Sequence, residues 1–296
     1  MTTPPDPLPK NLRSLTAKTT VKVALGLVVI KSITFLATNS SGILGSAADS
    51  LFDVCASLLV LWAILEAERP ADADHPWGHG KAEGLASLFQ GILILATGLT
   101  LVAHTVSRFF DEGDSGFSRA PIGIAVMIIS SAATLWLVRN LKSAAEKTNS
   151  PALAADSKHY TSDLLINLSV IIGLSTGQLL GGAPWPDLVV GLCIALIILN
   201  CARETFLSAI EMLMDRGLKA KESRSILEAV QNFAPRVSGF HDLRSRRSGA
   251  DIFIELHLDL ARDLSFVEAH DLSEDVGEAI SRKLTNATIT VHADPL

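Results

Sequence analysis

Six apolar segments in the first 210 residues restrict the possible fold more than any other feature of the sequence. Each is close to the ~20 residues that a helix needs to cross a lipid bilayer. The chain of 296 residues is 48% hydrophobic and only 19% charged, which is too apolar for an ordinary soluble protein of this size. We therefore expect a membrane domain with six transmembrane helices over residues 1–210. The segments are residues 20–37, 41–65, 84–106, 121–141, 162–180 and 186–207.

Basic residues are concentrated on one side of these predicted spans. The N-terminus and the connection between the fourth and fifth segments are rich in lysine and arginine, whereas the connection at 111–114 is acidic. Because basic connections stay in the cytoplasm, we expect a multi-pass membrane protein with both termini cytoplasmic. The basic residues on this side are Lys10, Arg13, Lys18, Lys22, Arg69, Lys81, Arg139, Lys142, Lys147 and Lys158.

Two carboxylates, Asp49 and Asp53, lie inside the second apolar segment. Their four-residue spacing places them on one face of a helix. A carboxylate at membrane depth costs roughly 2.5–3.5 kcal/mol on insertion scales, so a proton or a cation must neutralise it. His159 and Asp163 repeat the spacing at the fifth segment. Three carboxylates and one imidazole meeting between two helices would suit a divalent transition metal, although either pair alone also fits a polar pair at a helix end.

A lysine and a histidine also lie within the apolar segments. Lys31 lies in the first segment, where it could snorkel or pair with an acid, and we expect a position at the lipid edge. His104 lies in the third segment, where we expect a packed or lipid-edge histidine. Neither residue is assigned to a site by its spacing.

A second possible metal site lies in the connection between the second and third segments. Asp72, His75 and His79 fall within eight residues there. Carboxylate and imidazole groups so close in sequence can hold one metal ion. A solvated polar loop would show the same spacing, so both interpretations stay open.

The sequence changes character from residue 211. Charged residues become frequent, and no later apolar run is long enough to span a membrane. Residues 219–233 and 265–284 have helical apolar spacing, residues 251–260 alternate between apolar and polar, and residues 288–292 form a last short strand. With a further strand between the first helix and residue 251, this order predicts a small cytoplasmic α+β domain of αββαβ type over residues 211–296.

Four histidines fall in this C-terminal domain. His257 and His292 lie on predicted strands and His270 lies on a predicted helix, so a compact domain can bring them together at one edge. Their separation in sequence favours scattered surface histidines when it is considered alone. The candidate set is His241, His257, His270, His292 and Asp294.

Charge and cysteine usage exclude other classes. The net charge of −6 argues against nucleic acid as a partner. The three cysteines form no CxxC pattern, so neither a disulfide framework nor a thiolate zinc site is indicated.

Four motifs together resemble the cation diffusion facilitator family of divalent metal/proton antiporters, and in particular its bacterial zinc/iron-type members. The resemblance extends from the first apolar segment to Asp294. The motifs are Asp49-x-x-x-Asp53, His-Gly-Lys-Ala-Glu at 79–83, His159-x-x-x-Asp163 and His-Asp-Leu-Arg at 241–244.

The resemblance implies a role for each candidate residue. It implies a homodimer in the bacterial inner membrane, with six spans and a metallochaperone-like domain. This dimer would carry Zn²⁺ out of the cytoplasm in exchange for protons, with Cd²⁺, Fe²⁺ and Co²⁺ as other possible cargo. The implied transport site is Asp49, Asp53, His159 and Asp163, and the implied loop site is Asp72, His75 and His79. The implied cytoplasmic binuclear zinc site is His241, His257, His270, His292 and Asp294, and Lys81 and Asp215 are implied to form salt bridges between protomers.

Three other functions compete with transport as explanations of these motifs. A membrane-anchored metal sensor needs no paired acids at membrane depth. An intramembrane metalloenzyme needs an open coordination position and a general base, and the sequence has no HExxH motif. A proton-coupled carrier of organic cations would not explain the loop and C-terminal histidines. We therefore expect a transporter and not an enzyme, with the sensor as the alternative.

Overall fold

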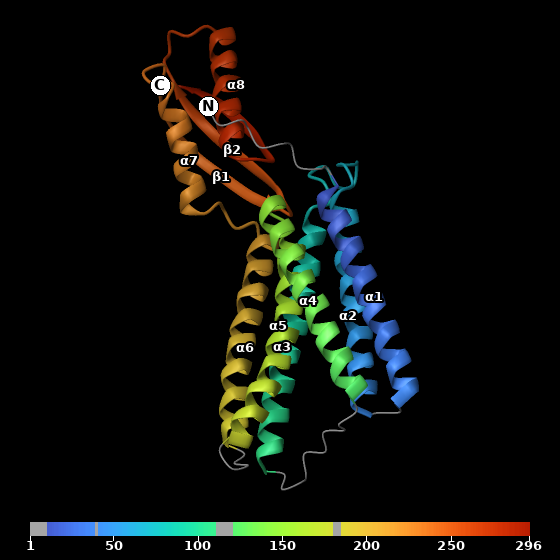
Figure 1. Ribbon diagram of the computed structural model, residues 1–296. Helices are drawn as coiled ribbons and strands as arrows, with labels where there is room; N and C mark the ends of the chain where they lie inside the picture. The colour runs from blue at the N-terminus through green and yellow to red at the C-terminus, as the bar shows by residue number, and fades with distance from the viewer. Residues whose placement is uncertain (1–10, 39–40, 111–120, 180–184) are drawn as a thin grey trace, which may run out of the picture. The chain divides into compact units, whose positions relative to one another are not determined.

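The computed structural model describes residues 11–38, 41–110, 121–179 and 185–296. The chain divides into two compact units, Met1–Ala209 and Ile210–Leu296. The first unit is helical and the second is a small α/β domain (Figure 1). The acidic connection at 111–114 lies outside the described residues.

Six long helices form the first unit. Four of them contain stretches that are long and apolar enough to cross a membrane, Leu12–Ala37, Leu44–Ala67, Lys81–Ser107 and Leu188–Leu213, when only the described residues are considered. A helical membrane domain is thus confirmed, and the count of six spans stays a prediction. The helices are α1 (Leu12–Thr38), α2 (Ser41–Ala67), α3 (Lys81–Phe110), α4 (Pro121–Thr148), α5 (Pro151–Leu179) and α6 (Trp185–Leu213).

Helix α5 begins eleven residues before the apolar segment that predicted it. Pro151 occupies its first position, where proline fits a helix, and the Ser150 hydroxyl accepts a hydrogen bond of 3.3 Å from the Leu153 amide. Hydropathy alone misses this polar first half. The early start places His159 well inside the helix.

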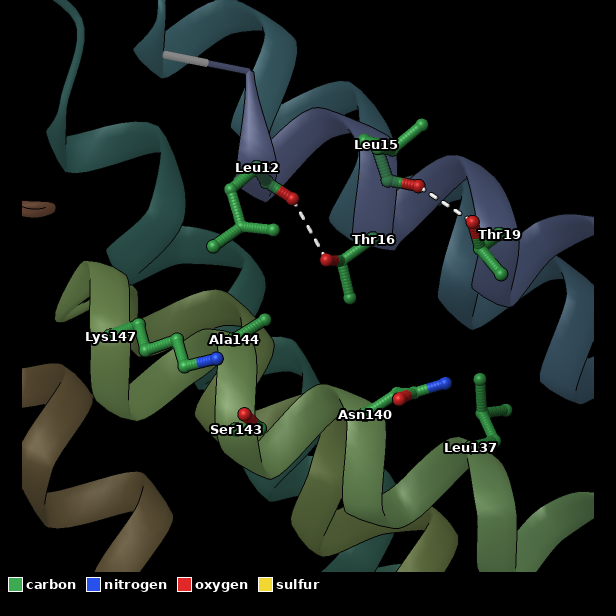
Figure 2. A pocket seen from close by; sticks show the side chains of 9 residues that line it. All are labelled: Leu12, Leu15, Thr16, Thr19, Leu137, Asn140, Ser143, Ala144 and Lys147. Atoms are coloured by element: carbon green, nitrogen blue, oxygen red, sulfur yellow. Dashed lines mark hydrogen bonds between the residues drawn. The ribbon is translucent and has the colours of Figure 1, made fainter. Parts of the chain in front are cut away.

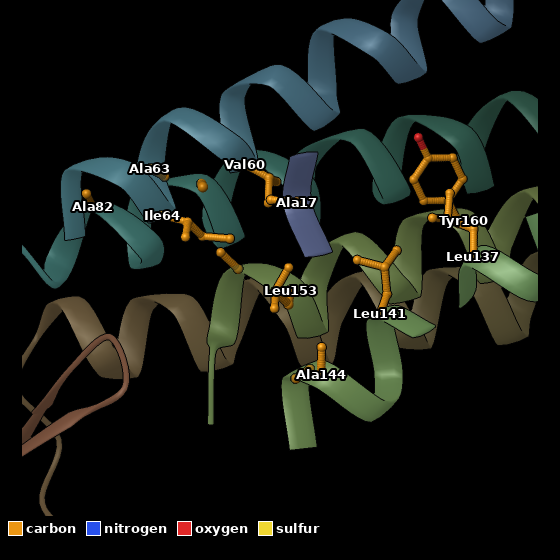
Figure 3. Packing of buried hydrophobic residues seen from close by; sticks show 13 residues of the cluster. Ala17, Val60, Ala63, Ile64, Ala82, Leu137, Leu141, Ala144, Leu153 and Tyr160 are labelled. Atoms are coloured by element: carbon orange, nitrogen blue, oxygen red, sulfur yellow. The ribbon is translucent and has the colours of Figure 1, made fainter. Parts of the chain in front are cut away.

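Small side chains allow the helices to approach closely. A cluster of buried alanines, leucines and neighbouring residues joins α1 to α5, and Tyr160 closes one end of it (Figure 3). Gly91 and Gly98 of α3 face Phe206 and Leu199 of α6 so closely that a Cβ atom would lie 3.1 Å or less from them. Such packing is typical of helices in lipid, where association depends on close contact.

A buried carboxylate fixes the start of α5. Glu83 of α3 is fully buried and accepts a 2.8 Å hydrogen bond from Arg13 Nη1 of α1. It also accepts hydrogen bonds from the Ser150 hydroxyl and the Ala152 amide. A negative charge is favourable at a helix N-terminus, so Glu83 ties α1 and α3 to the beginning of α5.

Large apolar side chains cover the outside of the first unit. Leu36, Phe52 and Leu196 are 80%, 72% and 67% exposed. Exposed apolar side chains at this density mark a surface that meets lipid or another protein, and on long apolar helices they fit lipid. His104 is also exposed on α3, in agreement with a lipid-edge position.

The second unit is a three-stranded sheet covered by two helices. The strand order is β1-β2-β3, with β1 antiparallel and β3 parallel to the central strand. This αββαβ order confirms the predicted domain type. The elements are α7 (Ala220–Gln231), β1 (Val237–Ser248), β2 (Asp251–Leu260), α8 (Phe266–Lys283) and β3 (Ala287–Pro295).

The alternation in β2 separates two faces of the sheet. Ile252, Ile254, Leu256 and Leu258 are buried in one core with residues of α7 and α8. Successive side chains of a strand point to opposite faces, so His257 lies on the face that the two helices leave uncovered.

Candidate metal sites

The first cluster lies between α2 and α5. One ligand atom from each of Asp53, His159 and Asp163 lies within 4.8 Å of the others. His159 Nε2 is 3.3 Å from Asp53 Oδ1 and 4.0 Å from Asp163 Oδ2. The hydroxyl groups of Ser57 and Tyr160 lie 2.8 Å apart beside this cluster and hold the two helices in register.

Polar atoms of this cluster lack partners although they are buried. His159 is 7% exposed, and His159 Nδ1 and Asp163 Oδ2 have no hydrogen-bond partner. An unsatisfied buried polar atom costs about 1–3 kcal/mol. A bound cation would provide partners for these polar atoms and so lower the cost, and protons bound in its place would do the same. The donor set of two carboxylates and one imidazole therefore fits a divalent transition metal.

Asp49 does not join this group of three. It lies one turn before Asp53 on α2, and its side chain is exposed. Four residues exceed one helical turn of 3.6 residues, so the two side chains differ in direction by about 40°. The structure therefore brings together three of the four residues predicted for this site.

Lys31 has a different environment from the one expected. Its ammonium group donates hydrogen bonds of 2.7 Å to Ser50 Oγ and 3.3 Å to the Ser46 carbonyl, both on α2. The expected lipid-edge position is therefore wrong, because Lys31 is bound to the helix that carries Asp49 and Asp53. Sequence reasoning missed it because the partners lie on another helix.

A second missed pair is fully buried. Gln90 Nε2 of α3 donates a 2.9 Å hydrogen bond to Asp156 Oδ1, three residues before His159 on α5. Asp156 Oδ2 and Gln90 Oε1 have no hydrogen-bond partner. The spacing of Asp156, His159 and Asp163 on one helix was the available signal, since residues three, four and seven apart share a face.

The second cluster lies in the loop after α2. His75 Nδ1 and His79 Nε2 lie 3.3 and 3.4 Å from the two oxygens of Asp72, so all three predicted residues meet. The His75 amide donates to Asp72 and holds the pKa of that carboxyl below its usual value. His79 Nδ1 is buried without a hydrogen-bond partner. Glu66, which sequence reasoning missed, lies 3.9 Å from His79 Nε2.

The third cluster lies on the uncovered face of the C-terminal sheet. His241, His257 and His292 occupy one row across the three strands, and Asp259 and Asp294 occupy a neighbouring row. They therefore meet on a face of the sheet and not at an edge.

Asp294 lies at the centre of this third cluster. Its carboxylate is 2.8 Å from His257 Nδ1, 3.2 Å from His292 Nε2 and 3.4 Å from His241 Nε2. The hydrogen bond with His257 is the main cause that holds the pKa of Asp294 below its usual value. His241, His257 and Asp294 offer ligand atoms within 4.8 Å of one another, which fits a zinc site.

The C-terminal cluster differs from its prediction in two residues: His270 lies apart from it, and Asp259 belongs to it although the sequence did not predict this. His270 lies on α8 and pairs with Glu274 at 3.5 Å. Because α8 covers the other face of the sheet, His270 does not reach the cluster within one chain. Asp259 Oδ1 is 2.9 Å from His241 Nδ1 and can orient that ring toward a metal.

The two residues implied in salt bridges between protomers lie in different units. Lys81 begins α3, and Asp215 follows α6 with a positive φ of 56°. Within the C-terminal unit Asp215 Oδ2 is 3.7 Å from Arg246 Nη1. Their pairing between protomers stays a prediction.

A pocket between α1 and α4 is no candidate metal site. Leucine, threonine, asparagine, serine, alanine and lysine side chains line it (Figure 2). This lining includes neither a carboxylate nor an imidazole, so it offers none of the ligands found in the three clusters.

Comparison with known proteins places these sites in a family. A family model of the cation efflux transmembrane domain matches residues 18–214, and a model of the cation efflux protein cytoplasmic domain matches residues 218–296. The chain belongs to the cation diffusion facilitator family. As a cation diffusion facilitator it is a multi-pass membrane transporter of the cation efflux type and not an enzyme.

Two cation-efflux pumps and one solved structure are among the proteins similar to this cation diffusion facilitator. The cation-efflux pump FieF of Shewanella oneidensis is 36% identical over 282 residues, covering 95% of this chain and 94% of the relative. FieF of Pectobacterium atrosepticum is 35% identical over 285 residues, covering 96% and 93%. A solved structure of CzrB in a zinc form is 32% identical, with a TM-score of 0.26, and covers 27% of this chain and 92% of that one.

Proposed function

We propose that this protein exports divalent transition metal ions, Zn²⁺ foremost, from the cytoplasm in exchange for protons. The observation that carries the proposal is the buried contact of His159 with Asp53 and Asp163 between two membrane helices. Asp49 is the fourth ligand in this proposal and joins when the cargo ion draws the carboxylates together. The protein works in the bacterial inner membrane with both termini in the cytoplasm.

Competition between metal and protons couples the two fluxes. Metal binds neutral imidazole and ionised carboxylate, so protonation of the same groups releases it. Histidine is the side chain whose charge changes most readily near neutral pH. A site that faces a less acidic cytoplasm loads metal, and the same site facing a more acidic exterior exchanges it for protons. Movement of helices around the site supplies the alternating access.

The ligand set favours some ions over others. Nitrogen and oxygen ligands accept Zn²⁺, Cd²⁺, Co²⁺ and Fe²⁺, and affinity order alone does not choose among them. The imidazole of His159 disfavours Mn²⁺, which prefers oxygen ligands. We place Zn²⁺ first because His159 supplies nitrogen and the carboxylates supply oxygen at a compact site.

The C-terminal cluster holds resident zinc in this proposal. When bound, zinc would join three strands of the sheet through His241, His257 and Asp294, with His292 beside them. Asp259 orients His241 from behind, as carboxylates do for ligating histidines. This domain is small and exposes Phe266 and Val267 strongly, so pairing of two chains would help to stabilise it. We therefore propose a homodimer, with Lys81 and Asp215 bridging the protomers.

The transport proposal is tested by metal uptake under a pH gradient, into proteoliposomes in which the cytoplasmic side of the protein faces outward. Zn²⁺, Cd²⁺, Fe²⁺ and Mn²⁺ are compared for the unaltered chain and for Asp53→Ala. We expect uptake of Zn²⁺ with counterflow of protons, weak uptake of Mn²⁺ and none by Asp53→Ala. Uptake by Asp53→Ala at the unaltered rate, or Zn²⁺ uptake without proton flux, would contradict the proposal.

A further inference from the structure

Lys31 is bound next to the transport site by two hydrogen bonds from α1 to α2. Its ammonium donates to Ser50 Oγ at 2.7 Å and to the Ser46 carbonyl at 3.3 Å. Ser50 follows Asp49 directly and precedes Asp53 by three residues, and it is 1% exposed. A flexible lysine held by a buried serine has a fixed charge position, unlike a lysine that snorkels to the membrane surface.

The charge of Lys31 acts on the carboxylates of the site. Ser50, which accepts the 2.7 Å hydrogen bond from the ammonium, lies one residue after Asp49 and three residues before Asp53 on α2, so the charge of Lys31 lies close to these two carboxylates. Lys31 thus supplies one positive charge to a group of acids in the absence of any metal, and the attraction is strong because water is scarce in the membrane interior.

We propose that Lys31 is a built-in cation that competes electrostatically with the transported metal and so sets the affinity of the site. The inference rests on the proposed transport function. A divalent ion that enters among these carboxylates meets the repulsion of Lys31, which weakens its binding. A transport site needs this limit, because an ion that binds too tightly cannot leave.

Three substitutions separate the charge of Lys31 from its hydrogen bonds. Lys31→Arg keeps the charge and the donors, Lys31→Gln keeps a donor to Ser50 without the charge, and Lys31→Met removes both. The control is Lys22→Met, which removes a lysine from an exposed position on the same helix. If Lys31 acts by charge, Gln and Met behave alike; if it only fastens α1 to α2, Gln behaves like lysine.

The measurement is Zn²⁺ affinity at one fixed pH, by competition with a fluorescent chelator. His75→Ala and His257→Ala are placed in every chain, so that binding at the loop and C-terminal clusters is weakened equally. We expect Lys31→Gln and Lys31→Met to lower the Kd by about tenfold or more, because each removes a positive charge that repels a divalent ion at this site. Lys31→Arg and Lys22→Met should leave the Kd unchanged.

Transport gives a second measurement. Lys31→Gln should lower both the KM and the maximal rate of Zn²⁺ uptake, since tighter binding slows release. An unchanged or higher Kd in Lys31→Gln would overturn the inference, and so would an equal fall in Lys22→Met. If Lys31→Met fails to fold, as judged by gel filtration in detergent, the Gln and Arg variants decide.

Failure of this inference is distinguishable from failure of the transport proposal. If Asp53→Ala still transports, the proposed site itself is wrong. If Asp53→Ala is inactive while Lys31→Gln binds Zn²⁺ like the unaltered chain, only the role of Lys31 is wrong.

Discussion

The intramembrane cluster and the C-terminal cluster use the same side chains in opposite surroundings. His159 of the first is 8% exposed at its side chain, whereas His241, His257 and His292 of the second are 48%, 37% and 66% exposed. The first leaves buried polar atoms without partners, and the second satisfies Asp294 through several histidines.

This difference shows what burial does to a metal-binding group. On the open sheet face, water solvates the charges, so the cluster can exist without metal at little cost. Between α2 and α5 the Asp53 and Asp163 side chains are 21% and 31% exposed, but they lie on helices of the membrane domain, where the acids depend on a cation, a proton or Lys31. The intramembrane cluster therefore needs a bound cation or protons at all times, which suits exchange of one for the other, whereas the exposed cluster tolerates both the metal-bound and the metal-free state.

Replacing the central histidine of each cluster, His159 or His257, should give the largest difference in Zn²⁺ uptake between the two clusters. His159→Ala should reduce Zn²⁺ uptake to the level of empty vesicles, because Asp53 and Asp163 lose the imidazole that lies close to both of them. His257→Ala should keep most of the uptake and lose Zn²⁺ from the C-terminal domain. Uptake in vesicles and metal content by atomic spectroscopy measure both. Full, equally pH-dependent uptake by His159→Ala would remove the distinction between the clusters.

The buried anchor of α5 should give the next largest effect. Arg13→Ala leaves Glu83 buried with fewer partners, so it should lower the stability of the helical unit by roughly 3 kcal/mol. The matched control is Arg69→Ala, whose side chain is 56% exposed and pairs with Glu66. That change should cost less than ~1 kcal/mol. Thermal unfolding in detergent compares them, and equal losses would show that the position of α5 does not depend on Glu83.

Replacement of Asp259 should affect the C-terminal cluster alone. Asp259→Asn removes the carboxylate that orients His241, which should weaken Zn²⁺ binding there by about 10–100-fold. Uptake through the membrane site should change far less. Calorimetric titration of Zn²⁺ compares Asp259→Asn with Asp263→Asn, an exposed change in the loop after β2. Unaltered Zn²⁺ affinity in Asp259→Asn would mean that Asp294 and the histidines suffice.

Local patterns in the sequence predicted the features that depend on residues close together in the chain. The alternation of residues 251–260 predicted β2 to the residue, and the four-residue spacing of His159 and Asp163 placed both on one face of a helix. The loop cluster was found because Asp72, His75 and His79 are close in sequence. In each case the interacting residues share one element or one short loop.

Contacts between elements could not be read in the same way. Three hydrogen bonds join residues on different helices or strands, so no local pattern in the sequence predicts them. They are Lys31 to Ser50, Gln90 to Asp156 and His241 to Asp259. His270 shows the converse error, because the sequence gives its helix but not which face of the sheet that helix covers. Non-local packing decides these positions, and periodicity carries no information about it.

The smallest effect is expected from the hydrogen bonds at the start of α8, which help to stabilise the C-terminal domain even when no metal is bound. Hydrogen bonds from the Ser265 side chain and amide hold the pKa of Glu268 below its usual value. A lowered pKa means that this contribution is present above about pH 4.5, the ordinary value, and is lost as the pH falls through the lower folded value. Glu268→Gln should therefore lower the melting temperature of the metal-free domain slightly at pH 7 and less at pH 3, as circular dichroism of the full chain with chelator can measure. Glu278→Gln, at an exposed position later in α8, is the control. An equal effect at both pH values would show that the Glu268 charge does not stabilise the helix, and that the metal-free domain depends on its core alone.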